Sequence, residues 1–326
     1  MTAPRIGKEI LYLSRADVVA CGVTPVRMNA VVEAVFLAEA QGTAWTQPKL
    51  ALFMPDGSSF RAKAGALIGP SYGAVKWFGY FPGNAARGLP DFWPMILLNE
   101  GETGFPVAMM DASWITAART ASITAAAAKH MARSGAKRVG FVACGTQARS
   151  NLDALAAAFS LTHVTAYSRN PRTAAAFAEL ACASGFAAEV ARDPRDAVRG
   201  QDIVVTSVPH ASTSSRFLDA ADVSPGTFVS MVDLGFGWRK ETLGEFDRVV
   251  TDNMAQSGPG GSEKLNFDGI YVGDLADVIG ERIPGRVSAE ERNALVFAGT
   301  GHVDAAAAIE VFEAACGGGI GTLLQL

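Results

Sequence analysis

The sequence predicts an α/β protein in which a doubly wound parallel sheet is inserted into an α+β domain. At 326 residues the chain is long enough for two domains. Between residues 47 and 110, short apolar or alternating runs are separated by Gly and Pro, which is typical of an antiparallel sheet. From residue 137 onward strands alternate with helices, as in a parallel sheet with helices on both faces.

The first 42 residues predict one strand and two helices. Residues 9–13 (EILYL) form the strand, and Ser14 caps a helix that begins directly after it. A second helix has Thr24 as its N-cap and Pro25 at the first helical position, and it ends at Gly42.

The antiparallel sheet is predicted to follow, and it ends in a long helix. Hairpin turns are expected at Pro55-Asp56-Gly57 and near Glu100-Gly101. The Ala-rich segment 114–134 forms the helix, which is expected to end at Gly135. The predicted strands are KLALFMP, SSFRAKAGALIG, YGAVKWFGYFP, DFWPMILLNE and PVAMMDA.

The parallel sheet begins at residue 137, and its strands are KRVGFVAC, HVTAYSR, AAEVA, DIVVTSV, FVSMVDLG and RVVTDN. Helices are expected over residues 147–159, 173–185 and 193–200. The segment 302–318 predicts an amphipathic helix that returns to the N-terminal domain. The resulting domains are residues 1–124 with 302–326, and residues 125–301.

Composition excludes several classes of protein. The net charge is -4 and no basic run is present, so nucleic-acid binding has little support. The four cysteines are scattered, without metal-ligand spacing, so no metal site is expected and the thiols are expected to be free. Charges interrupt the N-terminal segment and every long apolar run is broken, which predicts a cytoplasmic protein without a membrane span.

The run VACGTQA at residues 142–148 predicts a dinucleotide-binding turn. A strand, a tight turn through Gly145 and a helix would aim backbone N–H groups at a pyrophosphate. Ala143 and Ala148 replace the outer glycines of the usual fingerprint, so an ordinary strand–helix turn is the alternative. The candidate contacts are Gly145, Thr146, Gln147 and Ala148.

The loop after the next strand bears on the choice of cofactor. An acidic residue here would bind the adenosine ribose and exclude a 2′-phosphate, but the sequence has Ser168, Arg169 and Asn170. These residues are compatible with NADP, although arginine can also stack on adenine while asparagine contacts the ribose. Ser207 and Val208 complete the candidate cofactor contacts at the end of a later strand, and His210 is a weaker candidate.

Basic residues lie on strands where burial is expected. Arg61 and Lys63 are two residues apart and so point to one face of their strand, and Lys76 is flanked by Val75 and Trp77. Burial of an unpaired charge is costly, so such cations indicate an anionic ligand such as a carboxylate, with a surface location as the alternative. The candidate substrate-binding cations are Lys49, Arg61, Lys63, Lys76 and Arg119.

Four segments together resemble the ornithine cyclodeaminase/μ-crystallin family. They are AVKWFGYFPGNAARGLP (74–90), ETGFPVAMMDASWITAARTASITAAAAKHMA (102–132), VACGTQARSN (142–151) and AGTGHVDAAAAIEVFEAA (298–315). The resemblance covers nearly the whole chain. It implies a Rossmann domain for a nicotinamide cofactor, an α+β domain for substrate binding and dimerisation, a homodimer joined through the N-terminal sheets, and a substrate bound between the two domains.

The resemblance also assigns roles to residues. The family's carboxylate-binding cations match Lys76 and Arg119, and an earlier arginine of the family matches Lys49. His302 and Asp304 match a family segment near the active site. We therefore expect His302 to contact the substrate and Asp304 the cofactor, with capping of the final helix as the alternative for Asp304.

One departure from the family pattern bears on the reaction. Cyclodeaminases and archaeal alanine dehydrogenases of the family carry an aspartate that handles the substrate amine, and Gly235 stands at that position here. Asp233, two residues earlier, is the nearby acid and the third catalytic candidate beside Lys76 and Arg119. Cyclodeamination is therefore disfavoured, whereas reduction of a protonated imine needs mainly orientation and carboxylate anchoring.

The sequence thus predicts an NAD(P)H-dependent imine reductase acting on a small imino acid. The surplus of cations favours a dicarboxylic substrate, and the best hypothesis is reduction of iminosuccinate to L-aspartate. NAD(H) is slightly preferred as the cofactor and NADP(H) is not excluded. The alternatives are an ornithine cyclodeaminase, an alanine dehydrogenase, and a non-catalytic binder of cofactor and ligand.

Overall fold

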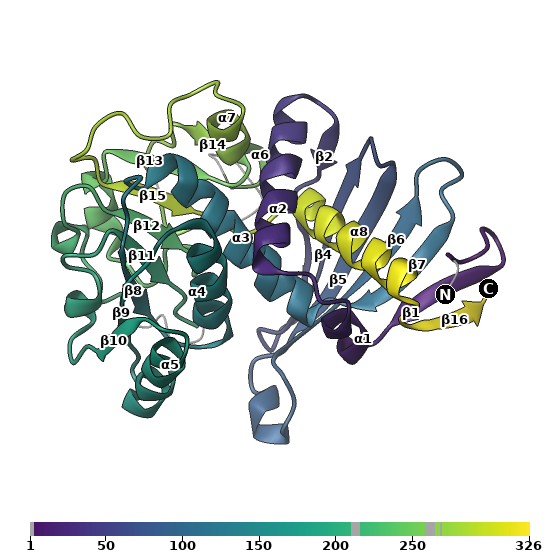
Figure 1. Cartoon of the computed structure of the whole chain (residues 1–326), viewed down its shortest axis with the longest axis horizontal. Coiled ribbons are helices and arrows are strands. Elements are labelled where there is room, and N and C mark those ends of the chain that lie inside the picture. The colour runs from purple at the N-terminus through teal and green to yellow at the C-terminus, as the bar shows by residue number, and fades with distance from the viewer. Residues whose placement is uncertain (1–2, 210–215, 258–264, 268) are drawn as a thin grey trace. The chain divides into compact units, whose positions relative to one another are not determined.

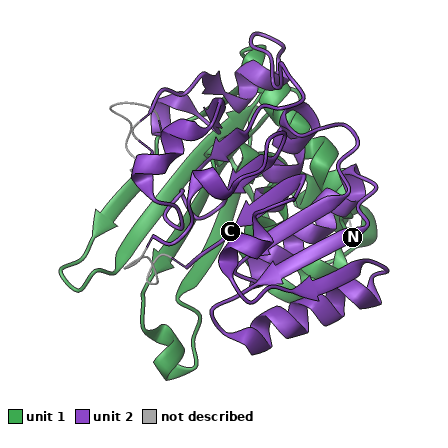
Figure 2. Ribbon diagram, turned by 90° about the vertical axis from the view of Figure 1, so that its left-hand side faces the viewer, with its two compact units in different colours: residues 1–119, 299–326 green, residues 120–298 purple. Residues whose placement is uncertain are grey.

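The computed structural model describes residues 3–209, 216–257, 265–267 and 269–326, so His210 lies outside the described residues. The chain divides into two units, coloured separately in Figure 2. Unit 1 consists of Met1–Arg119 and Gly299–Leu326, and unit 2 of Thr120–Ala298.

Unit 1 is built on one mixed sheet with the strand order β16-β1-β7-β6-β5-β4-β2, and β3 also pairs with β4. The predicted antiparallel ladder is confirmed from β3 to β7, including both hairpin turns. The sequence did not predict that β1 would pair with β7 in parallel or that the chain would end in a strand. The strands are β1 (Glu9–Leu13), β2 (Ala44–Thr46), β3 (Leu50–Phe53), β4 (Ser59–Leu67), β5 (Tyr72–Tyr80), β6 (Phe92–Glu100), β7 (Pro106–Asp111) and β16 (Thr322–Gln325).

Three helices belong wholly to unit 1. Ser14 caps α1 (Arg15–Ala20), and Thr24 caps α2 (Pro25–Ala40), as predicted. Helix α8 (Gly301–Gly318) lies beside α2 and packs on β4 and β5 (Figure 1). The prediction that α8 is amphipathic was wrong for its first half, because the sheet and α2 together bury every residue from 301 to 309.

The start of α8 rests directly on β4. A Cβ atom added to Gly65 would collide with the backbone of His302, and one added to Gly301 would collide with the carbonyl of Ala64. Two glycines therefore let the backbones touch, and this contact fixes the first turns of α8 against the strand.

Unit 2 is built on an all-parallel sheet with the order β10-β9-β8-β11-β12-β15-β13-β14. The first five strands confirm the doubly wound, Rossmann-like prediction, because the chain starts in the middle of the sheet and reverses beside β8. The sequence missed β15, which lies between β12 and β13. The strands are β8 (Arg138–Val142), β9 (His163–Tyr167), β10 (Ala187–Val190), β11 (Ile203–Thr206), β12 (Phe228–Met231), β13 (Arg248–Thr251), β14 (Gly273–Asp274) and β15 (Asn293–Val296).

Helix α3 (Ser113–Met131) begins in unit 1 and continues into unit 2. It ends four residues before the predicted Gly135, because Arg286 and Asn293 side chains donate to the carbonyl of Met131. Residues 193–200 form a short 3-10 turn, Pro194–Ala197, instead of the predicted helix. The remaining helices are α4 (Thr146–Ala158), α5 (Pro171–Ala183), α6 (Met254–Ser257) and α7 (Leu275–Ile279).

Candidate functional site

Two lysines lie opposite one another on the sheet of unit 1. Lys63 is on β4 and Lys76 is on β5, and the register pairs them directly. Both are buried, with exposed fractions of 4% and 1%. Like charges at directly opposite positions repel, and burial of a charge is costly. This face of the sheet therefore holds positive charge that requires an anion nearby.

A carboxylate and a guanidinium complete the group, which we name the cation cluster (Lys63, Lys76, Arg119 and Asp304). Asp304 Oδ1 lies 2.6 Å from Lys76 Nζ and 2.8 Å from Arg119 Nε. Asp304 does not cap α8, because Thr300 is the N-cap residue and the aspartate side chain binds the two cations instead. The alternative that Asp304 is a helix cap is therefore wrong.

The cation cluster contains three buried cations and one buried carboxylate. Lys63 Nζ donates to the carbonyl oxygen of Gly299 at 2.7 Å. Arg119 Nη1 and Asp304 Oδ2 are buried, and neither has a hydrogen-bond partner within the described part of the chain. Buried polar atoms are normally satisfied, so the Arg119 donor fits a ligand that brings a carboxylate, whereas Asp304 Oδ2 is an acceptor and fits an N–H group.

Burial changes the acid–base properties of the cation cluster. Burial, together with the positive charge of Arg119, lowers the pKa of Lys76 to about 7, although Asp304 opposes the change. Burial and the charge of Lys76 also hold the pKa of Lys63 well below its ordinary value. Burial raises the pKa of Asp304, but the charges of Arg119 and Lys76 outweigh it and keep that pKa low. Bringing an anion to this group would favour the protonated lysines.

Gly299 also belongs to this site, and the sequence did not predict it. Its backbone has φ +80°, and an added Cβ would collide with the guanidinium of Arg119. Its carbonyl also accepts the hydrogen bond from Lys63. The signal was present in the run AGTG at residues 298–301, where two glycines precede the predicted final helix at 302–318.

The structure places Lys49 near the cation cluster and gives Arg61 other partners. Lys49 is half-buried just before β3, and its charge lowers the pKa of both Lys63 and Lys76. The Arg61 guanidinium instead stacks over Phe53 and Tyr80, at 5.6 Å and 6.0 Å from the ring centres. A role for Arg61 in substrate binding remains a prediction.

His302 and Asp304 are both buried on α8, but they have different neighbours. Two residues on a helix are separated by about 200° around its axis. Accordingly, His302 contacts α2, with Nε2 3.1 Å from Glu39 Oε2 and its ring edge-to-face with Phe36. Asp304 lies in unit 1 within the cation cluster, so its predicted contact with a cofactor remains a prediction.

Unit 2 carries a cavity of about 470 Å³ at the carboxyl ends of β8, β9 and β11. This is the edge where ligands bind in doubly wound sheets. Thr146, Gln147 and Ala148 follow the cavity in the first turn of α4. Six predicted cofactor contacts line the cavity, namely Gly145, Ser168, Arg169, Asn170, Ser207 and Val208.

The turn before α4 fits a dinucleotide phosphate. Gly145 is the N-cap residue and makes no side-chain cap, and the first turn of the helix has no acidic residue. Gln147 Oε1 is buried, with no hydrogen-bond partner in the described residues. Ala143 adopts φ 72°, the left-handed backbone that the missing glycine of the fingerprint would adopt easily. The turn thus keeps the shape of the fingerprint although most of its glycines are absent.

Asp233 lies in unit 2, after β12, where it joins the ends of two strands. Its carboxylate accepts hydrogen bonds from Thr206 Oγ1 at 3.0 Å and from the backbone N–H groups of Val208 and Gly235 at 3.3 and 3.2 Å. Burial raises the pKa of Asp233 to about 6, against these hydrogen bonds. These hydrogen bonds hold the backbone at Val208, which lines the cavity. The catalytic role of Asp233 remains a prediction.

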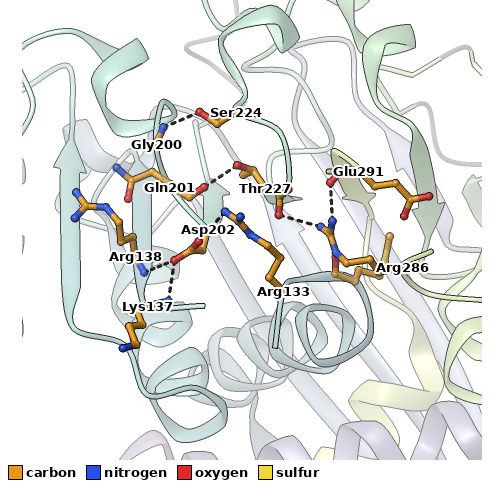
Figure 3. Close-up of polar contacts among 12 residues, drawn as sticks. Arg133, Lys137, Arg138, Gly200, Gln201, Asp202, Ser224, Thr227, Arg286 and Glu291 are labelled. Atoms are coloured by element: carbon orange, nitrogen blue, oxygen red, sulfur yellow. Dashed lines mark hydrogen bonds and ion pairs between the residues drawn. The ribbon is translucent and has the colours of Figure 1, made fainter. Parts of the chain in front are cut away.

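The opposite, amino edge of the same sheet holds a second group of basic side chains (Figure 3). We name Arg133, Asp202 and Arg286 the amino-edge cluster, and they line a hollow of about 630 Å³. Arg286 donates to the carbonyl oxygens of Met131, Gly226, Ser288 and Glu291 at 2.7–3.1 Å. Asp202 accepts from Arg133 and from two backbone N–H groups.

Across the described ranges, no group of three or more His, Cys, Asp or Glu side chains could hold a metal ion. In the same residues, no helix combines the length and the apolar character that crossing a membrane requires.

The fold and the turn before α4 define an α/β protein with a Rossmann-like unit and a second, mixed-sheet unit. The chain belongs to the ornithine cyclodeaminase/mu-crystallin family, whose family model matches residues 12–319. The resemblance drawn from the four sequence segments is therefore confirmed.

Similar proteins agree with this assignment. An alanine dehydrogenase from Archaeoglobus fulgidus is 32% identical over 326 residues, covering 97% of this chain and 98% of that protein. The Thermococcus litoralis Δ1-pyrroline-2-carboxylate reductase, solved with NADH and L-proline, is 25% identical with a TM-score of 0.86, covering 96% and 99% of the two chains. The predicted enzyme class, an oxidoreductase, is confirmed by these relatives.

A third protein shares the fold. The iminosuccinate reductase of Paracoccus denitrificans, solved with NAD+, has a TM-score of 0.83 over 98% of this chain and 100% of its own. Because the two sequences are 23% identical, the likeness concerns the fold and carries no argument about the substrate.

Proposed function

We propose that this protein is an NAD(H)-dependent imine reductase that converts a small dicarboxylic imino acid, iminosuccinate, to L-aspartate. The observation that carries the proposal is the charge of the cation cluster. Lys63, Lys76 and Arg119 are buried together with the single carboxylate of Asp304. With both lysines protonated, the three cations exceed the one carboxylate by two charges, a number that a dicarboxylic ligand matches.

The proposed roles follow from position. Lys76 and Arg119 anchor the carboxylate beside the imine carbon, because both already bind one carboxylate, that of Asp304. Lys63, directly opposite Lys76 in the sheet, binds the second carboxylate. Two anchored carboxylates fix the orientation of the imine, and orientation is the main requirement for reduction of a protonated imine.

The cofactor is assigned to the cavity of unit 2. The backbone N–H groups at Gly145, Thr146 and Gln147 would hold the pyrophosphate at the start of α4. When bound, the nicotinamide supplies the hydride for the reduction. NAD(H) is proposed because two solved structures of similar fold, an archaeal alanine dehydrogenase and the Thermococcus litoralis reductase, contain NAD and NADH.

We also propose that the active form is a homodimer. The face of the unit 1 sheet that points away from α8 exposes large apolar side chains, among them Trp45, Trp77 and Trp93 at 43–52% exposure. Exposed apolar patches of this kind mark association surfaces. A molar mass near that of one chain in light scattering would contradict the dimer.

A second candidate is an alanine dehydrogenase, which is favoured by the 32% identity to the archaeal enzyme. It would act on a monocarboxylate, so it leaves the charge of Lys63 without a role. An ornithine cyclodeaminase is not supported, because Gly235 stands where the family's aspartate handles the amine. The backbone of Gly235 has φ 78°, a conformation that an aspartate adopts with strain.

The test compares two substrates on two variants. Purified protein is given NADH with oxaloacetate and ammonia, which form iminosuccinate, or with pyruvate and ammonia. We expect turnover with the oxaloacetate mixture, and we expect Lys63→Met to raise its KM about tenfold or more. The exposed Lys8→Met serves as the matched control. Turnover only with the mixture of pyruvate and ammonia would contradict the dicarboxylate proposal. An unchanged KM for the oxaloacetate mixture in Lys63→Met would also contradict it.

A further inference from the structure

The two carboxylate oxygens of Asp304 have different surroundings. Oδ1 lies 2.6 Å from Lys76 Nζ and 2.8 Å from Arg119 Nε, so both cations share one oxygen. Oδ2 is buried, and no described residue donates a hydrogen bond to it. A buried oxygen without a donor is costly, because it has lost its hydrogen bonds to water. The contacts of Asp304 thus leave one oxygen for a donor that a ligand brings.

Asp304 is a charged acceptor rather than a proton donor. Burial raises the pKa of its carboxyl group, but the charges of Arg119 and Lys76 outweigh burial and hold that pKa below its ordinary value. The carboxylate is therefore ionised at neutral pH and can only accept hydrogen bonds. Its best partner is a cationic N–H group, since charge-assisted hydrogen bonds are stronger than neutral ones.

The first turns of α8 hold this carboxylate in place. Gly301 and Gly65 bring the backbones of α8 and β4 into contact. The backbone N–H of Asp304 donates to the carbonyl oxygen of Thr300 at 3.3 Å, so the helix is already formed at this residue. Asp304 is only 1% exposed. The free oxygen therefore keeps a fixed position beside Lys76, and a fixed acceptor can orient a ligand.

An amino or imino acid has the matching arrangement of charges. Its carboxylate and its nitrogen are bonded to the same carbon atom, so the two charged groups are neighbours. The cation cluster places carboxylate donors, on Lys76 and Arg119, beside an acceptor for N–H, Asp304 Oδ2. The cluster is therefore complementary to both charged groups of such a ligand, and not to its carboxylate alone.

The other acid considered for the nitrogen has both of its oxygens bonded. Asp233 Oδ1 accepts from Thr206 Oγ1 and from the backbone N–H of Gly235, and Oδ2 accepts from the backbone N–H of Val208. Gly235, at the position where the family's aspartate handles the amine, has no side chain. The hydrogen bonding thus favours Asp304 over Asp233 as the acid that contacts the substrate nitrogen.

We propose that Asp304 Oδ2 accepts a hydrogen bond from the protonated imine nitrogen of the substrate and from the ammonium group of the product. In the reduction, hydride adds to the imine carbon and the π electrons of the C=N bond move to nitrogen. The neutral amine then takes a proton from water. Asp304 orients the nitrogen and favours its protonated form, but it transfers no proton. This inference rests on the proposed function, because it concerns the substrate of that reaction.

The test compares ligands that differ only in the amino group. L-Aspartate and succinate are titrated calorimetrically, without and with NAD+, into the full-length protein, Asp304→Asn and Asp196→Asn. Asp196→Asn is the matched control, because Asp196 is exposed in unit 2. Both ligands carry two carboxylates, so the ratio of their Kd values cancels any effect of a variant on carboxylate binding.

The wild type and Asp196→Asn should bind L-aspartate about tenfold or more tightly than succinate. Asp304→Asn should bind the two ligands within about threefold of one another. A preference that survives in Asp304→Asn would overturn the inference. The same titration with Asp233→Asn would then show whether Asp233 contacts the nitrogen instead.

L-Alanine and propionate form a second pair, which separates the inference from the proposed substrate. A preference for L-alanine that Asp304→Asn abolishes, without binding of L-aspartate, would support the inference and count against the dicarboxylate proposal. A wild type that prefers neither amino acid over its deaminated partner would overturn the inference. This last comparison needs no variant, so it stays decisive even where Asp304→Asn does not fold.

Discussion

The cation cluster of unit 1 and the amino-edge cluster of unit 2 use basic side chains in opposite ways. In the amino-edge cluster Arg286 donates to four backbone carbonyls, and Arg133 pairs with Asp202. In the cation cluster the lysines have lowered pKa values, and Arg119 Nη1 lacks a hydrogen-bond partner among the described residues. The two clusters therefore differ in how completely the N–H donors of their basic side chains are hydrogen-bonded.

This difference separates a structural role from a binding role. Donors that are already saturated by backbone carbonyls stabilise the fold, because removing them leaves buried acceptors unsatisfied. Cations that repel one another reduce stability, and their gathering in the cation cluster supports the proposed anionic ligand. Whether the N–H donors of a basic side chain already have partners therefore helps to distinguish a structural residue from a ligand-binding one.

The largest expected effect is on activity, from Arg119→Leu. Loss of a buried carboxylate anchor should lower kcat/KM on the order of 1000-fold. The melting temperature should change little, because Asp304 keeps its contact with Lys76. Steady-state kinetics and a thermal melt of the same sample check this pair of outcomes. A large loss of stability with intact activity would place Arg119 with the structural arginines.

The next effect is on stability, from Arg286→Met. Removal of a donor to four carbonyls should lower the free energy of unfolding by about 2–3 kcal/mol. Arg282→Met is the control, since Arg282 is 55% exposed and pairs with Asp277 at 3.4 Å, so its loss should cost less than about 0.5 kcal/mol. Urea denaturation measures both. Equal denaturation midpoints for the two variants would contradict the structural role of Arg286.

The smallest effect, taken per pH unit, is a pH dependence set by Lys76. Its pKa of about 7 lies below the ordinary 10.5, so between these values the unfolded chain holds a proton that the folded chain lacks. Stability should therefore rise with pH above 7 relative to Lys76→Met, by at most about 1.4 kcal/mol per pH unit. Meanwhile kcat/KM should fall above pH 7, because a neutral lysine no longer anchors the carboxylate.

Lys76→Arg provides the reference for that profile. Arginine stays charged over the whole range, so the ratio of wild type to Lys76→Arg removes the pH dependence of the substrate itself. The charges of Lys49, Lys63, Arg119 and Asp304 act on Lys76 in the free enzyme. A ratio that stays flat from pH 6 to 9 would show that Lys76 does not titrate in this range.

The sequence predicted what depends on local patterns. The alternation after residue 137, the cap at Thr24 and the cations on β4 and β5 could all be recognised from neighbouring residues. The pairing of β1 with β7 could not, because it joins segments almost 100 residues apart and leaves no periodic signal. The first half of α8 is buried on all sides for the same reason, since its partners come from β4 and α2.

The candidate site was predicted in part. Lys63, Lys76 and Arg119 were marked by charge in apolar surroundings, and the structure brings them together. The pairing of Asp304 with Lys76 and Arg119 was not predicted, because an acid in the first turn of a helix usually serves the helix itself, and its contact with a cofactor stays a prediction. The four carbonyls bound by Arg286 come from the end of α3, from Gly226 and from the segment before β15, so no local sequence pattern could have assigned this role.

Gly299 has a consequence for reading the sequences of other family members. Its left-handed backbone and its contact with the Arg119 guanidinium leave no room for a side chain. A relative that keeps both cations but carries any other residue at the matching position would have to move its arginine. Position 299 thus reports, through the absence of a side chain, whether the anion site is intact, and it could separate catalytic members from those that have lost the reaction.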